Sequence, residues 1–174
     1  MTDQVGDGAV ATLYDDYLAL ESDLSAMPSG LAALNRSYHK HLLLAAASSL
    51  EDKVKRLVSE IFERHGSDRL ATFVSKRVMA RGYHTLFNWE GGTAQGFFTS
   101  FGDACASAFR TELRSDNDLG EQHDAFMRLG QLRNELVHND YASALIELTP
   151  DEIMDKYELA LRFVGRIESF VLVD

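Results

Sequence analysis

The segment Arg133-Asn134-Glu135-Leu136-Val137-His138 lies near the end of a stretch with helical periodicity. We interpret the rest of the predicted fold as support for this segment. Within it, an always-charged guanidinium and a titratable imidazole lie five residues apart. An arginine can hold two phosphate oxygens and carry the charge that develops on them, whereas a histidine can exchange a proton near neutral pH. This pair is suited to phosphodiester chemistry, and we expect no metal ion and no cofactor.

The helix that carries this segment is predicted from about Leu119 to His138. Its apolar residues fall on one narrow stripe that we assign to the core, namely Ala125, Leu129, Leu132 and Leu136. The polar run at 115–118 breaks the preceding segment and can cap this helix.

The remaining chain also shows helical spacing. Helices are predicted over about 10–24, 31–65, 68–81 and 94–113, with a break at 35–38 left open. The centre of the second helix, residues 42–47, is apolar on all sides and is expected to be buried all round. The glycine pair at 91–92 predicts a tight turn.

A last helix is predicted to begin at Thr149-Pro150-Asp151-Glu152. This run is a capping box with proline at the first helical position. The sequence has no convincing β-hairpin signal. We therefore predict an all-α fold, a bundle of five to seven helices.

Composition predicts one ordinary globular domain over residues 1–174, with residues 1–8 flexible. The single cysteine, Cys105, excludes an intrachain disulfide framework, is expected to be a buried structural thiol, and suits a reducing compartment. No apolar run reaches the roughly 20 residues that span a bilayer, and the first residues lack the basic start of a signal peptide. We therefore expect a cytoplasmic protein without a membrane partner.

The net charge of −10 argues against a broad electrostatic grip on nucleic acid, because such binding needs a positive surface. It leaves room for a small cleft lined by a few arginines, and it also suits a basic protein partner. Candidates for a rim that guides RNA are Lys53, Lys55, Arg56, Arg77 and Arg81. For each of these, a solvated helix face is the alternative.

The motif resembles a known signature. Arg133-Asn134 followed by His138, in the penultimate helix of a small all-helical chain, is similar to the R-polar-x3-H pattern of the HEPN superfamily. The apolar run from Leu42 to Leu50 with Glu51 behind it is similar to a helix of the RiboL-PSP-like HEPN branch. The resemblance implies a homodimeric ribonuclease of the toxin or antiviral-defence kind, with an antitoxin or a defence-complex protein as a further partner.

The expected reaction is endonucleolytic cleavage of RNA through attack by the 2′-OH, an internal nucleophile beside the phosphodiester. His138 would be the acid or base and Arg133 the clamp on the phosphorane, while Asn134 would orient His138 or bind phosphate. The resemblance also implies that Glu51 approaches the cleft, although a solvated position is the alternative. DNA lacks the 2′-OH, so we expect RNA to be preferred over DNA.

Helix geometry poses a problem for this site. Five residues turn the direction of a helix by about 140°, so Arg133 and His138 should not share one face. Either the helix unwinds at its end, where Asn139-Asp140 would allow it, or a second chain completes the site.

Three alternatives to a catalytic site stay open. Arg133 and His138 could form a surface ion pair and a polar helix end that suits the helix dipole. The chain could be a non-catalytic helical dimer that binds a protein or a nucleotide. It could also be a non-catalytic subunit of a larger defence complex.

Overall fold

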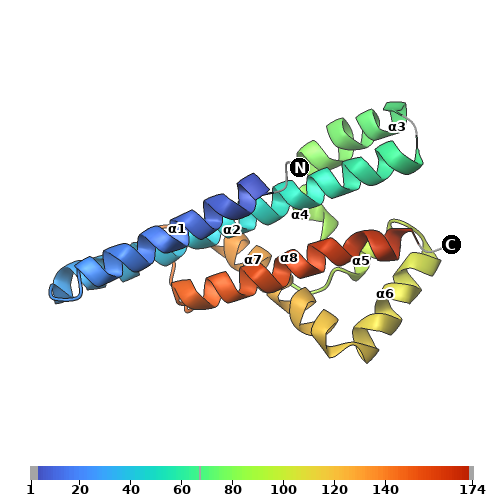
Figure 1. The fold of residues 1–174 in the computed structure, drawn as a ribbon. Helices are drawn as coiled ribbons and strands as arrows, with labels where there is room; N and C mark the ends of the chain where they lie inside the picture. The colour runs from blue at the N-terminus through green and yellow to red at the C-terminus, as the bar shows by residue number, and fades with distance from the viewer. Residues whose placement is uncertain (1–3, 67, 173–174) are drawn as a thin grey trace. The chain divides into compact units, whose positions relative to one another are not determined.

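The computed structural model describes residues 4–66 and 68–172, and Figure 1 shows their helices. The five long helices are α1 (Gln4–Asp23), α2 (Pro28–His65), α6 (Asp103–Ser115), α7 (Asn117–His138) and α8 (Pro150–Val171). The short ones are α3 (Asp68–Phe73), the π-helix η1 (Val74–Met79), α4 (Ala80–Leu86) and α5 (Gln95–Thr99). Because α3, η1 and α4 follow without a gap, they form one stretch, and the described residues then contain seven helices and no strand. The predicted all-α bundle is confirmed.

Several predicted boundaries were wrong. Helix α1 begins at Gln4, six residues before the predicted start, and residues 1–3 of the predicted flexible end lie outside the described residues. The long helix predicted over 31–65 is confirmed without the break that was left open at 35–38, but α2 begins at Pro28, three residues before the predicted start. The segment predicted as one helix over 94–113 is two helices, because Gly102 between them has a φ of 110° that helices do not accommodate.

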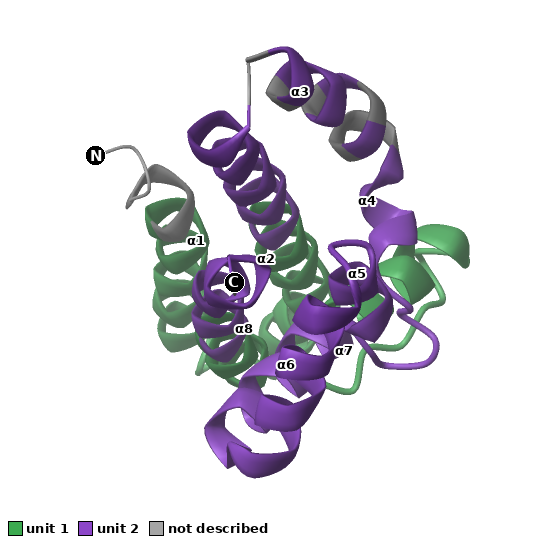
Figure 2. Cartoon of the chain, turned by 90° about the vertical axis from the view of Figure 1, so that its right-hand side faces the viewer, with its two compact units in different colours: residues 1–49, 129–158 green, residues 50–128, 159–174 purple. Residues whose placement is uncertain are grey.

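The chain divides into two compact units, coloured separately in Figure 2. Unit 1 comprises residues 1–49 and 129–158, and unit 2 comprises residues 50–128 and 159–174. Helices α2, α7 and α8 each contribute residues to both units. That the two units act as one domain stays a prediction.

Unit 1 is held together by apolar packing and by hydroxyl groups. Tyr38 donates to the carbonyl oxygen of Leu13 at 2.8 Å, which ties α2 to α1, and Tyr14 donates to Asp151 at 2.8 Å, which ties α1 to α8. Its core contains Leu42, Leu43, Ala46, Ala47, Leu129, Leu132, Leu136, Ile153 and Tyr157. The prediction for residues 42–47 is thus confirmed for four residues, while Leu44 and Ala45 are partly exposed.

The start of α8 has the predicted capping box. The Thr149 backbone N–H donates to Glu152 Oε2 at 2.8 Å, and the Glu152 N–H donates to Thr149 Oγ1 at 3.2 Å. These hydrogen bonds to Thr149 hold the pKa of the Glu152 carboxyl below its ordinary value. Two of the N–H groups that a helix start leaves unpaired are satisfied in this way.

Unit 2 has an aromatic core. Its most deeply buried rings are those of Phe97, Phe98, Phe109, Phe126, Phe163 and Phe170, each at most 2% exposed. Trp89, 7% exposed, also belongs to this core, and its Nε1 donates to the carbonyl oxygen of His84 at 3.0 Å. The predicted turn at the glycine pair is confirmed, since Asn88 and Thr93 pair across it.

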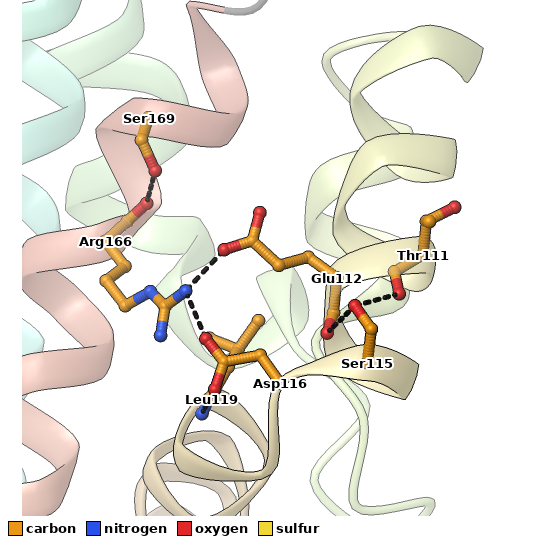
Figure 3. Close-up of polar contacts among 7 residues, drawn as sticks. All are labelled: Thr111, Glu112, Ser115, Asp116, Leu119, Arg166 and Ser169. Carbon is orange, nitrogen blue, oxygen red and sulfur yellow. Dashed lines mark hydrogen bonds and ion pairs between the residues drawn. The ribbon is translucent and has the colours of Figure 1, made fainter.

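One arginine joins three helices within unit 2, as Figure 3 shows. Arg166 of α8 donates to Asp116 Oδ2 at 2.7 Å and also contacts Glu112 of α6. Asp116 is at the same time the N-cap of α7, because its Oδ1 accepts the Leu119 N–H at 3.1 Å. This confirms the predicted cap at 115–118. The bond to Arg166 and that cap hold the pKa of Asp116 below its ordinary value.

Candidate active site

Helix α7 packs its apolar stripe against the core. Arg133 of the motif lies beside that stripe. Leu129, Leu132 and Leu136 are each at most 2% exposed, as the periodicity predicts. At about 100° per residue, Arg133 lies about 40° from Leu129 around the helix axis and about 60° from Leu136. Arg133 is therefore at the edge of the buried stripe, which explains why it is half-buried.

The guanidinium of Arg133 is supported by its neighbour. Arg133 Nη1 donates to Asn134 Oδ1 at 3.2 Å, and both side chains are half-buried. Asn134 therefore helps to orient Arg133. Its two predicted roles, orienting His138 and binding phosphate, stay predictions.

His138 is the last residue of α7 and is exposed. It lies about 200° around the axis from Leu136, so it faces away from the buried stripe. The helix does not unwind before this residue, because the Asn139 N–H still donates to the Glu135 carbonyl oxygen at 3.1 Å. Arg133 and His138 thus remain about 140° apart and about 7.5 Å along the axis, so one chain does not place them on one face.

A tight turn follows the motif. Asp140 Oδ1 accepts the Ala142 N–H at 3.1 Å, and the Asp140 carbonyl oxygen accepts the Ala144 N–H at 2.9 Å. Lys40 of α2, which sequence reasoning missed, also contacts this turn. The available signal was a charged residue two positions before the buried leucines at 42 and 43.

Glu51 belongs to unit 2, where Lys55 and His84 lie beside its carboxylate. Its carboxylate contacts Lys55, and its Oε2 lies 3.9 Å from His84 Nε2. Lys55 Nζ in turn lies over the Tyr83 ring, 5.8 Å from its centroid. The carboxylate is thus held by its own unit, and a catalytic role for it stays a prediction.

The other predicted residues have varied positions. Lys53 is half-buried and Arg56 is exposed on α2, while the side chains of Arg77 and Arg81 lie outside the described ones. Cys105 is 5% exposed, which confirms its predicted burial, and burial raises the pKa of its thiol. Its structural role stays a prediction. Within residues 4–66 and 68–172, no group of three or more His, Cys, Asp or Glu could hold a metal ion. None of the helices in these ranges combines the length and the apolar character that a membrane span needs.

Unit 1 also contains a cavity of about 380 Å³. Glu21, Glu147 and Asp151 line it, and no lysine or arginine is among its described lining residues. Burial lowers the pKa of His39 in its wall, which disfavours a positive charge on this imidazole. The cavity is therefore unsuited to phosphate, and the candidate active site remains the end of α7.

Comparison with known proteins supports the resemblance seen in the motif. A family model described as RiboL-PSP-HEPN matches residues 13–172, which include all of α2 to α8. The comparisons with curated proteins and with solved structures found no match. Because the family model covers most of its length, the chain belongs to the RiboL-PSP-HEPN family of HEPN-type domains.

Proposed function

We propose that the protein is a metal-independent endoribonuclease that cleaves RNA through attack by the 2′-OH. The HEPN family is associated with nuclease, RNA-related or defence functions. The observation that carries the finer proposal is the end of α7. There a guanidinium supported by Asn134 and an exposed imidazole occur on one helix of a HEPN domain.

In the proposed reaction the 2′-oxygen attacks the adjacent phosphorus, and the bond from phosphorus to the 5′-oxygen breaks. The products are a 2′,3′-cyclic phosphate and a free 5′-OH. His138 exchanges a proton with the attacking or the leaving oxygen, while Arg133 binds the phosphoryl oxygens as their negative charge grows. General acid or base catalysis typically contributes 10²- to 10⁴-fold, which sets the expected loss on removing His138.

A second copy of the chain supplies the missing half of each site. Because α7 stays helical to His138, one chain presents Arg133 and His138 in different directions. A two-fold dimer places two motifs around one cleft, so that Arg133 of one copy works with His138 of the partner subunit. Apolar side chains near His138 in the chain favour such contact, since Val137, Tyr141 and Leu145 are 50%, 41% and 92% exposed.

The acidic body fits a locally held substrate. With a net charge of −10, the protein would contact few RNA phosphates, so its affinity for RNA should depend weakly on the salt concentration. The same charge suits a basic protein partner, such as an antitoxin or a defence-complex subunit, in a cytoplasmic toxin or antiviral system. It also favours the second candidate function, a non-catalytic dimer that binds such a partner.

The deciding experiment is RNA cleavage in excess EDTA by wild type, Arg133→Ala and His138→Ala. We expect wild type to cut and to leave 2′,3′-cyclic phosphate ends, and we expect Arg133→Ala and His138→Ala not to cut. The matched control is His41→Ala, an exposed histidine of α2 in unit 1, which should cut like wild type. Folding and the mass of the assembled oligomer are checked for wild type and the three variants. Equal cleavage by all variants, or cleavage of an RNA whose riboses are 2′-O-methylated, would contradict the proposal.

Wild type that cuts nothing while binding a basic partner tightly would favour the non-catalytic dimer instead. That partner is sought by testing the product of a neighbouring gene in a binding titration.

A further inference from the structure

Unit 1 contains one buried cation whose role the motif does not explain. Lys40 of α2 is 6% exposed and lies two residues before the buried Leu42, with the exposed His41 between them. Lysine is almost never buried unless its ammonium group has partners, because removing the charge from water is costly. The partners of Lys40 therefore indicate what the residue is for.

Those partners all belong to the turn after the motif. Lys40 Nζ donates to the carbonyl oxygen of Tyr141 at 2.8 Å and to that of Ala142 at 3.4 Å. The same nitrogen lies over the Tyr141 ring, 5.2 Å from its centroid. Lys40 and Tyr141 are 101 residues apart in the chain, so this contact fixes the turn against a distant helix of the same unit.

The position of the turn relates it to His138. The chain is held before the turn by the hydrogen bond from the Asn139 N–H to Glu135, and two residues later by Lys40. Among the described residues, no hydrogen bond holds the His138 side chain itself. The backbone on either side therefore determines where this imidazole lies.

We propose that Lys40 is a positioning residue for His138, which it holds in place by fixing the Tyr141–Ala142 turn at the end of α7. A cation suits this task, because charge-assisted hydrogen bonds to carbonyls are strong and the C-terminal end of a helix attracts positive charge. The catalytic consequence rests on the proposed function. The structural consequence, an ordered turn, does not depend on the proposed function.

The test compares Lys40→Met, Lys40→Arg and the control Lys156→Met, a half-buried lysine of α8 in the same unit. Methionine keeps the length of the stem but removes the charge and the donors, whereas arginine keeps both. Three quantities are measured in each dimer: amide hydrogen exchange over residues 139–144, the NMR resonances of the His138 imidazole, and kcat and KM for a fluorogenic RNA.

We expect Lys40→Met to speed exchange over 139–144 by roughly tenfold while exchange in the core of α2 is unchanged. The NMR resonances of the His138 imidazole should move because its position changes. The kcat should fall roughly 10- to 100-fold with KM changed less than about twofold, because small misplacements of a catalytic group have costs of this size. Lys40→Arg should bring the exchange rate, the His138 resonances and kcat most of the way back to their wild-type values. Lys156→Met should resemble wild type in all three.

The proposal is overturned if Lys40→Met leaves the exchange of 139–144 and the His138 resonances as in wild type. It is also overturned if exchange rises equally throughout the protein and Lys40→Arg does not rescue it, since that is a general loss of stability. If wild type cuts no RNA, the proposed function fails, whereas the exchange and NMR results still decide the role of Lys40.

Discussion

The guanidinium of Arg133 and the amide of Asn134 form a hydrogen-bonded pair on adjacent residues, with 3.2 Å between Nη1 and Oδ1. Adjacent residues of a helix point about 100° apart, so this contact holds the guanidinium of Arg133 toward the side of the helix that carries Asn134. The pair limits the directions that the guanidinium can take. A fixed guanidinium is better suited to binding two phosphate oxygens than a freely rotating one.

The first prediction concerns this support. Asn134→Ala should lower kcat about fivefold, because a hydrogen bond of this kind is worth about 1 kcal/mol. The loss should be smaller than that of Arg133→Ala, which removes the clamp itself. The measurement is RNA cleavage with Asn139→Ala, an exposed asparagine beside the motif, as the control. A loss as large as that of His138→Ala would instead assign Asn134 a direct role.

The second prediction tests the composite site. Dimers with one Arg133→Ala chain and one His138→Ala chain should regain about half of the wild-type activity, because one of their two sites keeps both groups. Each variant should be inactive alone. The assay mixes two differently tagged chains and purifies the mixed dimer before RNA is added. Mixed dimers that stay inactive would show that each site takes Arg133 and His138 from the same chain.

The third prediction follows from the pair of Arg166 and Asp116. The pKa of Asp116 is lower in the folded protein than its ordinary value of 3.8. Its contribution to stability is therefore complete above that pH and is lost as pH falls through the folded pKa. Arg166→Met should be less stable than wild type at pH 7, and the difference should narrow in acid.

The measurement is urea unfolding from neutral pH to about pH 3. Arg162→Met, an exposed arginine of the same helix and unit, is the control and should parallel wild type at every pH. A difference between Arg166→Met and wild type that is the same at all pH values would show that Arg166 acts through packing alone.

The fourth prediction concerns the capping box of α8. Thr149→Ala should lower the free energy of unfolding by about 1 kcal/mol, because the Glu152 N–H loses its acceptor. Glu152→Gln should have a smaller effect, since glutamine can still accept from the Thr149 N–H. Thermal unfolding measures both, with the exposed Thr12→Ala of α1 as a control whose midpoint should not fall below that of wild type, because alanine is the better helix former. Equal stability of Thr149→Ala and wild type would rule out the cap as a source of stability.

Local signals predicted much of the fold. The cap at Asp116, the capping box at Thr149 and the stripe of Leu129 and Leu136 depend on neighbours within a few residues, so the sequence alone displays them. The break at Gly102 was missed because the phenylalanine spacing continues through it. The role of Lys40 was missed because its contact with Tyr141 joins residues 101 positions apart.

The candidate site likewise combines features that near neighbours in the sequence determine and features that depend on the folded backbone. Arg133, Asn134 and His138 form a compact motif that sequence reasoning can find. Whether the helix end would unwind was left open, because the choice depends on hydrogen bonds such as the one from Asn139 to Glu135. Residue types alone do not predict these backbone hydrogen bonds, because the bonds depend on the conformation of the turn.

The discontinuous composition of unit 1 has a consequence for synthesis on the ribosome. The helix segment with Arg133 and His138 packs in a unit that also needs residues 1–49 and residues up to 158. A nascent chain that ends before Ile153 and Tyr157 lacks two of the buried side chains of this unit. The motif is therefore translated before the residues that complete its unit, so unit 1 can pack fully only after residue 158 has been synthesised.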